Sequence, residues 1–129
     1  MNDPRASDSS PFDISVDGSR TMLRYRMTGL WDEAIFARFH EACLAHMRRF
    51  HLRGEPFDLL GDLTEFPTQP AKLNEMREAL VHDAIALGLR KCGVVTNSQL
   101  VKMQLGRLSS QHYAFFTTEA EALAWIEEE

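Results

Sequence analysis

The sequence predicts a single α/β domain built on a mixed, mostly parallel sheet of five strands with about four helices. Two short runs near the start alternate apolar with polar residues and are separated by Asp17-Gly18, a strong hairpin signal. After this hairpin, helical and strand-like segments alternate strictly in the order β-β-α-β-α-β-α-β-α, which is typical of parallel sheets. The chain has 129 residues, of which 44% are apolar and 26% charged, as expected for one globular domain.

Residues 1–11 are predicted to form a disordered tail, and residues 12–129 the domain. The tail, MNDPRASDSSP, is polar and lacks the apolar run of a signal peptide. The predicted hairpin follows, with strands at FDISVDG (12–18) and RTMLRYRMTG (20–29). Arg24 and Arg26 alternate with apolar neighbours, so one face of the hairpin is expected to meet water.

Residues 31–50, WDEAIFARFHEACLAHMRRF, show the longest helical pattern. Asp32 and Glu33 in the first turn, and Arg48 and Arg49 in the last, agree with the charges that a helix dipole favours. The apolar stripe of this helix contains Ile35, Phe39, Cys43 and Phe50, with Phe36 and Met47 at its edge.

The next strand is predicted at FDLLGDL (57–63) and the next helix at PAKLNEMREALVHDAIALG (70–88). Pro70 suits the first helical position, where its missing N–H costs nothing. Gly88 suits the C-terminal cap. The stripe expected to be buried contains Leu73, Met76, Leu80, Ala84 and Leu87.

The chain closes with a strand at KCGVVT (91–96), a helix at SQLVKMQLGRLS (98–109), a strand at YAFFT (113–117) and a helix at TEAEALAWIEEE (118–129). Thr118 and Glu121 form a capping box, whereas the three terminal glutamates oppose the dipole and should let that end fray. If successive strands are neighbours, right-handed crossovers place most helices on one sheet face. The other face then needs cover from the hairpin, the tail or a partner, and a homodimer is one such partner.

Charge and composition argue against several classes of function. The net charge is −5 with Lys and Arg spread along the chain, so nucleic-acid binding has no electrostatic support. No apolar run approaches the roughly 20 residues that span a bilayer. Cys43 and Cys92 lie in apolar contexts, so we expect reduced, buried thiols in a cytoplasmic protein.

The best candidate binding or switch surface is the loop after the third strand, with Asp62, Thr64, Phe66 and Thr68. Ligands of α/β proteins bind beyond the carboxyl ends of parallel strands. A phosphate on Thr64 would face the carboxylates of Asp62 and Glu65, whereas one on Thr68 would lie at a helix N-terminus, where an anion is stabilised. The favoured interpretation is that Thr64 satisfies backbone groups of the turn and that Thr68 helps to start the helix.

Asn97 and Ser98 form a second polar loop, expected beside the first, and helix capping is again the favoured interpretation. His40, Cys43 and His46 spread over roughly 120° of their helix, too wide for one metal ion. We therefore expect no metal and no other cofactor.

The sequence contains no GxGxxG, P-loop, GxSxG or HExxH motif. A nucleophilic pair of Cys92 with His112 is not favoured, because a thiol at the start of a buried strand stays neutral. We therefore do not expect an enzyme.

The element order and four local sequences resemble the STAS domain family of anti-sigma-factor antagonists, most closely its SpoIIAA-like branch. These sequences are FDLLGDLTEF, KCGVVT, YAFFTT and TEAEALAWIEEE, and they lie within residues 12–129. The resemblance implies a mixed sheet wound with helices and a non-enzymatic role. Signalling members carry an Asp-Ser-Ser/Thr-Gly switch after the third strand. The present loop, LTEFPTQPAKL, lacks that pattern and matches it only in the residue types of Asp62, Thr64 and Thr68.

These observations together predict a non-catalytic regulatory or protein-interaction module that works through a protein partner. The alternative is a carrier or sensor of a small apolar ligand, because the wider group that the chain resembles also contains lipid-binding proteins. Leu30, Trp31 and Phe66 are the apolar residues whose loop or edge positions could leave them exposed to a partner or ligand.

Overall fold

The computed structural model describes residues 10–106 and 111–128. The predicted disordered tail lies outside the described residues except for Ser10 and Pro11. Five strands form one sheet in the order β1-β2-β3-β4-β5, so each strand neighbours its successor in the chain. β1 is antiparallel to β2, and all other neighbours are parallel. The predicted α/β class and mostly parallel five-stranded sheet are confirmed.

The elements lie close to their predicted positions. The strands are β1 (Phe12–Asp17), β2 (Met22–Thr28), β3 (Phe57–Glu65), β4 (Leu89–Val95) and β5 (Tyr113–Phe116). The helices are α2 (Glu33–Leu52), α3 (Asn74–Leu87), α4 (Gln99–Gly106) and α5 (Glu119–Glu127). Pro70 precedes a 3₁₀ turn, Ala71–Leu73, rather than the first α-helical turn. The predicted end of the third helix, residues 107–109, lies outside the described residues.

Local chemistry accounts for the helix ends. The Asp32 carboxylate accepts a hydrogen bond of 2.8 Å from the Ile35 amide at the start of α2. The Thr118 hydroxyl accepts one of 3.2 Å from the Glu121 amide at the start of α5. Gly88 ends α3 with φ of 114°, a left-handed conformation that glycine adopts without strain. The caps at Thr118 and Gly88 were predicted from the sequence, whereas Asp32 was expected in the first turn of α2 and is its N-cap.

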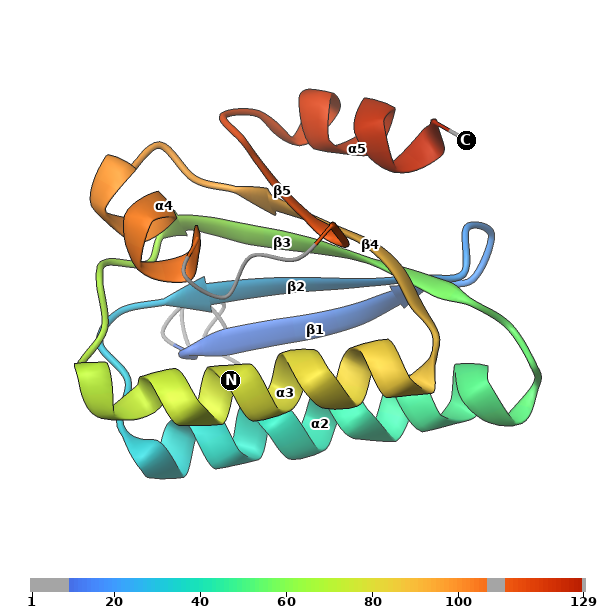
Figure 1. Cartoon of the computed structure of the whole chain (residues 1–129), viewed down its shortest axis with the longest axis horizontal. Helices are drawn as coiled ribbons and strands as arrows, with labels where there is room; N and C mark the ends of the chain where they lie inside the picture. The colour runs from blue at the N-terminus through green and yellow to red at the C-terminus, as the bar shows by residue number, and fades with distance from the viewer. Residues whose placement is uncertain (1–9, 107–110, 129) are drawn as a thin grey trace, which may run out of the picture.

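The helices are divided unequally between the two faces of the sheet (Figure 1). Side chains of α2, α3 and α4 share one apolar cluster with the sheet, whereas α5 packs on the opposite face. The second face is therefore covered in part by α5, which was not foreseen. The crossover rule constrains a helix between two parallel strands. Because no strand follows α5 in the described residues, that rule does not apply to it.

Cations of β4 hold the C-terminal end of α5, which was expected to fray. The Lys91 ammonium donates to the Trp125 and Glu128 carbonyls, each at 2.7 Å, and Arg90 donates to the Ile126 carbonyl at 2.6 Å. Positive charge at a helix C-terminus is stabilising, and here it offsets the unfavourable glutamates.

Candidate functional site

The loop after β3 begins with a turn ordered by Asp62. One oxygen of its carboxylate accepts hydrogen bonds from the Thr64 amide at 3.0 Å and from the Thr64 hydroxyl at 2.7 Å. This local pattern is typical of Asp in turns. Thr64 is exposed, and its hydroxyl stabilises the turn, as the favoured interpretation predicts.

The middle of this loop turns its apolar side chain inward. Phe66 is 4% exposed, and its ring lies edge-on to Trp31 at a centroid distance of 5.4 Å. Neither aromatic is therefore available as an exposed contact, whereas Leu30 is 71% exposed. Thr68 is exposed at the far end of the loop, and its predicted role as a helix cap is wrong: Pro70 and Leu73 precede the 3₁₀ turn and α3, and neither start has a side-chain cap within the described residues.

Gln69, a residue that the sequence did not single out, holds the loop in place. Its buried side chain accepts from the Trp31 amide at 2.8 Å and donates to the Gly29 carbonyl at 3.0 Å. The Gln104 side chain of α4 bonds both the amide and the carbonyl of Gln69, each at 2.8 Å. The loop is thereby tied to α4 and to the segment before α2.

The second predicted loop starts α4. The Ser98 hydroxyl accepts from the Val101 amide at 3.1 Å, so Ser98 caps the helix. Asn97 is exposed. Asp62 pairs with Val95 across the sheet, so the two polar loops leave neighbouring strands at the same edge, as predicted. Within the described residues, no hydrogen bond or ion pair joins Asn97 or Ser98 to Asp62, Thr64 or Thr68.

A shallow groove of about 440 Å³, lined by polar and apolar residues, lies on the half of the second face that α5 leaves open. Asp62 and Thr64 line it with residues of β1, β2 and the start of α5. Arg26 pairs with Asp13 at 2.9 Å, and Arg24 pairs with Glu119 at 3.3 Å. The groove therefore presents charges of both signs, already matched with one another.

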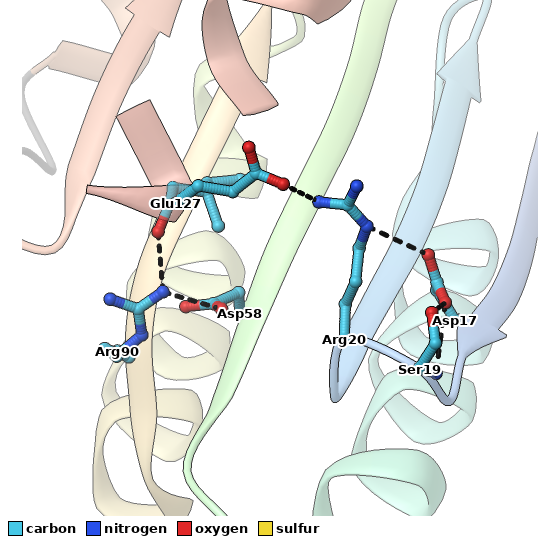
Figure 2. Close-up of polar contacts among 7 residues, drawn as sticks. Asp17, Ser19, Arg20, Asp58, Arg90 and Glu127 are labelled. Carbon is cyan, nitrogen blue, oxygen red and sulfur yellow. Dashed lines mark hydrogen bonds and ion pairs between the residues drawn. The ribbon is translucent and has the colours of Figure 1, made fainter. Parts of the chain in front are cut away.

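A further polar cluster at the amino ends of the parallel strands fastens α5 to the sheet (Figure 2). Arg90 lies between the Asp58 carboxylate, at 3.0 Å, and the end of α5. Arg20 bridges Glu127 of α5 and Asp17 of the hairpin turn. The hydrogen bond from the Ser19 hydroxyl lowers the pKa of the Asp17 carboxyl. The arrangement is a clamp between elements.

An apolar cavity of about 70 Å³ lies on the other face, between α2, α3 and the sheet. Its walls come from all four of β2 to β5 and from three helices. Aromatic rings, methionines and aliphatic side chains make up most of the lining, which includes Met27, Phe39, Met47, Leu80, Ala84 and Phe115. Small-molecule sites have a similar apolar lining, but their volume is usually several times larger, roughly 300–1,000 Å³.

The cavity also receives a buried arginine. Arg77 is 7% exposed, and its Nε and Nη1 atoms have no hydrogen-bond acceptor in the part of the chain that the structure describes. Arg77 was not predicted from the sequence, although its position in the chain contained the signal. It lies four residues after Leu73 and three before Leu80, within the apolar stripe of α3.

Tyr25, Tyr113 and Cys43 supply the remaining polar side-chain atoms of the lining, and Cys92 lies next to Tyr25 outside it. The Tyr25 hydroxyl lies 3.6 Å from the Cys92 sulfur. Burial raises the pKa of both the Cys43 and the Cys92 thiol to about 12, and it raises the pKa of Tyr25 and Tyr113 well above the usual value. These four groups are protonated and uncharged at neutral pH.

The histidines of α2 do not converge on a metal-binding geometry. His40 contacts the Asp83 carboxylate of α3 at 3.0 Å. Among the described residues, no three His, Cys, Asp or Glu side chains gather where they could hold a metal ion.

No protein-family model matches the sequence, and no curated protein matches it. Within residues 10–106 and 111–128, no helix has the length and apolar character needed to cross a membrane.

Proposed function

We propose that this protein is a non-catalytic carrier or sensor that binds a small apolar ligand between α2, α3 and the sheet. The observation that carries the proposal is the apolar cavity of about 70 Å³, because protein interiors normally leave few voids larger than a water molecule. Burying apolar ligand surface there is favourable, and the few polar groups can orient the ligand.

The size of the cavity restricts the ligand. Its volume, about 70 Å³, is roughly half that of an engineered cavity that takes up benzene, about 150 Å³. Met27 and Met47 line it, and their unbranched thioether chains repack easily. We therefore expect a ligand of a few carbon atoms, or a short chain that displaces these methionines.

The titratable groups of the cavity support binding rather than nucleophilic catalysis. Catalytic cysteines react as thiolates. The thiol of Cys43, with its pKa raised to about 12, is protonated at neutral pH, and the same holds for Cys92. Neither sulfur is then a nucleophile.

Straight-chain alcohols from butanol to octanol test the proposal when titrated against isotope-labelled protein. We expect shifts of amide resonances around the cavity, with an affinity maximum at an intermediate chain length. Ala84→Leu fills the cavity and should weaken binding about tenfold or more, at an overpacking cost of about 1–3 kcal/mol.

Ala86→Leu is the matched control, because Ala86 lies on the exposed side of the same helix. This variant should bind the alcohols as the native protein does. Shifts scattered over the surface, or binding that Ala84→Leu leaves unchanged, would contradict the proposal.

The second candidate is the regulatory, protein-binding module that the STAS resemblance implies. The observation in its favour is the open groove with charges of both signs, which suits a protein partner of mixed charge. Native mass measurement of protein from its own host separates the candidates. Extra mass that disappears on denaturation supports the carrier, whereas an empty chain that takes up no alcohol favours the second candidate.

A further inference from the structure

Arg77 occupies an unusual position for a charged residue. It lies in the first part of α3, on the side facing α2 and the sheet, and lines the apolar cavity. Its neighbours along the buried stripe are Leu73, which is fully buried, and Leu80, which is half-buried. Arginine is seldom buried to this extent unless it is paired.

The guanidinium lacks a counter-charge within the described residues. Nη2 donates to the Asn74 side-chain oxygen, which is neutral, while Nε and Nη1 have no acceptor among residues 10–106 and 111–128. Nε carries one N–H and Nη1 two. A buried charge of this kind is costly unless it is paired and hydrogen-bonded, so the site is incomplete without an acceptor.

Neighbouring acidic groups do not fill this need. Asp83 of α3 pairs with His40, and Glu75 and Glu78 are exposed. Tyr25 and Tyr113 line the same cavity as neutral phenols. A water molecule there would find few other polar partners, because most of the lining is apolar.

We propose that the cavity selects a short apolar ligand that ends in a carboxylate, and that Arg77 binds this carboxylate. The inference rests on the proposed function, since it assigns the head group of the ligand held in the same cavity. A carboxylate oxygen accepts strong, charge-assisted hydrogen bonds from a guanidinium. The apolar chain then lies among Met27, Phe39, Met47 and Leu80, away from water.

Hexanoate, 1-hexanol and hexanamide provide the test, because they share the length of the chain and differ in the head group. Calorimetric titration of the native protein should give hexanoate an affinity about tenfold to a hundredfold above that of either neutral ligand. In the native protein, the Nε–H resonance of Arg77 should move downfield with hexanoate and stay in place with hexanol.

Variants at Arg77 show how much its positive charge contributes to the preference for hexanoate. Arg77→Met keeps the length of the side chain and should bind hexanoate no better than hexanol. Arg77→Lys keeps the charge and should retain part of the preference. Arg48→Met is the control, because Arg48 is exposed on α2 and its loss should leave the preference unchanged.

The outcomes separate the two proposals. Equal binding of hexanoate and hexanol by the native protein, with an unmoved Arg77 resonance, overturns the carboxylate inference and leaves the carrier proposal standing. Binding of none of the three ligands overturns both. A preference for hexanoate that persists in a folded Arg77→Met variant assigns the head group to other residues and overturns the inference.

Discussion

Gly61 of β3 makes room for a side chain that crosses its strand. Tyr25 of β2 lies opposite Gly61 in the sheet, and its hydroxyl reaches Cys92 of β4. A Cβ atom at position 61 would overlap the Tyr25 ring. The glycine is required here for space, and it lets one tyrosine contact two strands and line the cavity.

We expect Gly61→Ala to displace the Tyr25 ring and destabilise the protein by about 1–3 kcal/mol, the usual cost of overpacking. Urea unfolding measures the change. Adding Tyr25→Leu removes the overlap, so the double variant should lose less stability than the sum of the single variants. Strict additivity of the two changes would show that the crowding does not occur.

For single residues, the sequence predicted hydrogen bonds between near neighbours in the chain better than it predicted which side chains are buried. The turn of Asp62 and Thr64 and the cap at Ser98 follow from contacts between near neighbours in the chain. Phe66 and Arg77 depend on what the rest of the fold places beside them. A loop phenylalanine can face either way, and an arginine on an apolar stripe often extends its charge to water.

α5 is the element whose position depends most on specific polar contacts. Arg90 joins the Asp58 carboxylate of β3 to the Ile126 carbonyl of α5 (Figure 2). The Asp58 side chain is buried, and its second oxygen has no partner among the described residues. Loss of Arg90 would leave that carboxylate without its cation.

We expect Arg90→Met to lower the free energy of unfolding by about 1–3 kcal/mol, because a buried acceptor loses its donor. Arg24→Met is the comparison, since the Arg24–Glu119 contact with the same helix is solvent-exposed and should cost less than about 1 kcal/mol. Urea unfolding of both variants is the measurement. Equal losses would mean that the clamp is no stronger than a surface ion pair.

The order of the elements was predictable and the side on which α5 packs was not. Alternation of strands and helices, with the hairpin signal at Asp17-Gly18, leads to the observed strand order. The position of α5 depends on how Ala122 and Ile126 fit over Gly93 of β4. A Cβ atom at position 93 would lie only 3.2 Å from the Cβ atom of Ala122, so the close approach of the helix favours glycine there. Such shape matching between distant segments has no periodic signal in the sequence.

The stability of the whole molecule depends on pH through four side chains, two thiols and two phenols, that are protonated in the folded core at neutral pH. Cys43 and Cys92 each have a pKa raised to about 12, and Tyr25 and Tyr113 are raised in the same direction. Because the unfolded thiols release their protons near pH 9.0, the unfolded state binds fewer protons than the folded state above that pH. Stability from these groups is complete below pH 9.0 and is lost as the pH rises toward 12.

We therefore expect the free energy of unfolding to fall as the pH rises above 9, by up to about 1.4 kcal/mol per pH unit for each thiol. Urea unfolding under reducing conditions at pH 8, 9.5 and 10.5 measures the slope. Cys43→Ala and Cys92→Ala should each flatten it. An unchanged slope in the double variant would show that the thiols do not contribute.

If the cavity binds the proposed ligand, the buried guanidinium of Arg77 would also link ligand occupancy to the lifetime of the protein. A ligand that binds only the folded state stabilises it by mass action, whereas the empty protein keeps an uncompensated buried charge. Proteases act on the transiently unfolded fraction, so the empty form would be degraded faster than the filled form. On this view the abundance of the protein would follow the supply of its ligand, with no dedicated regulator.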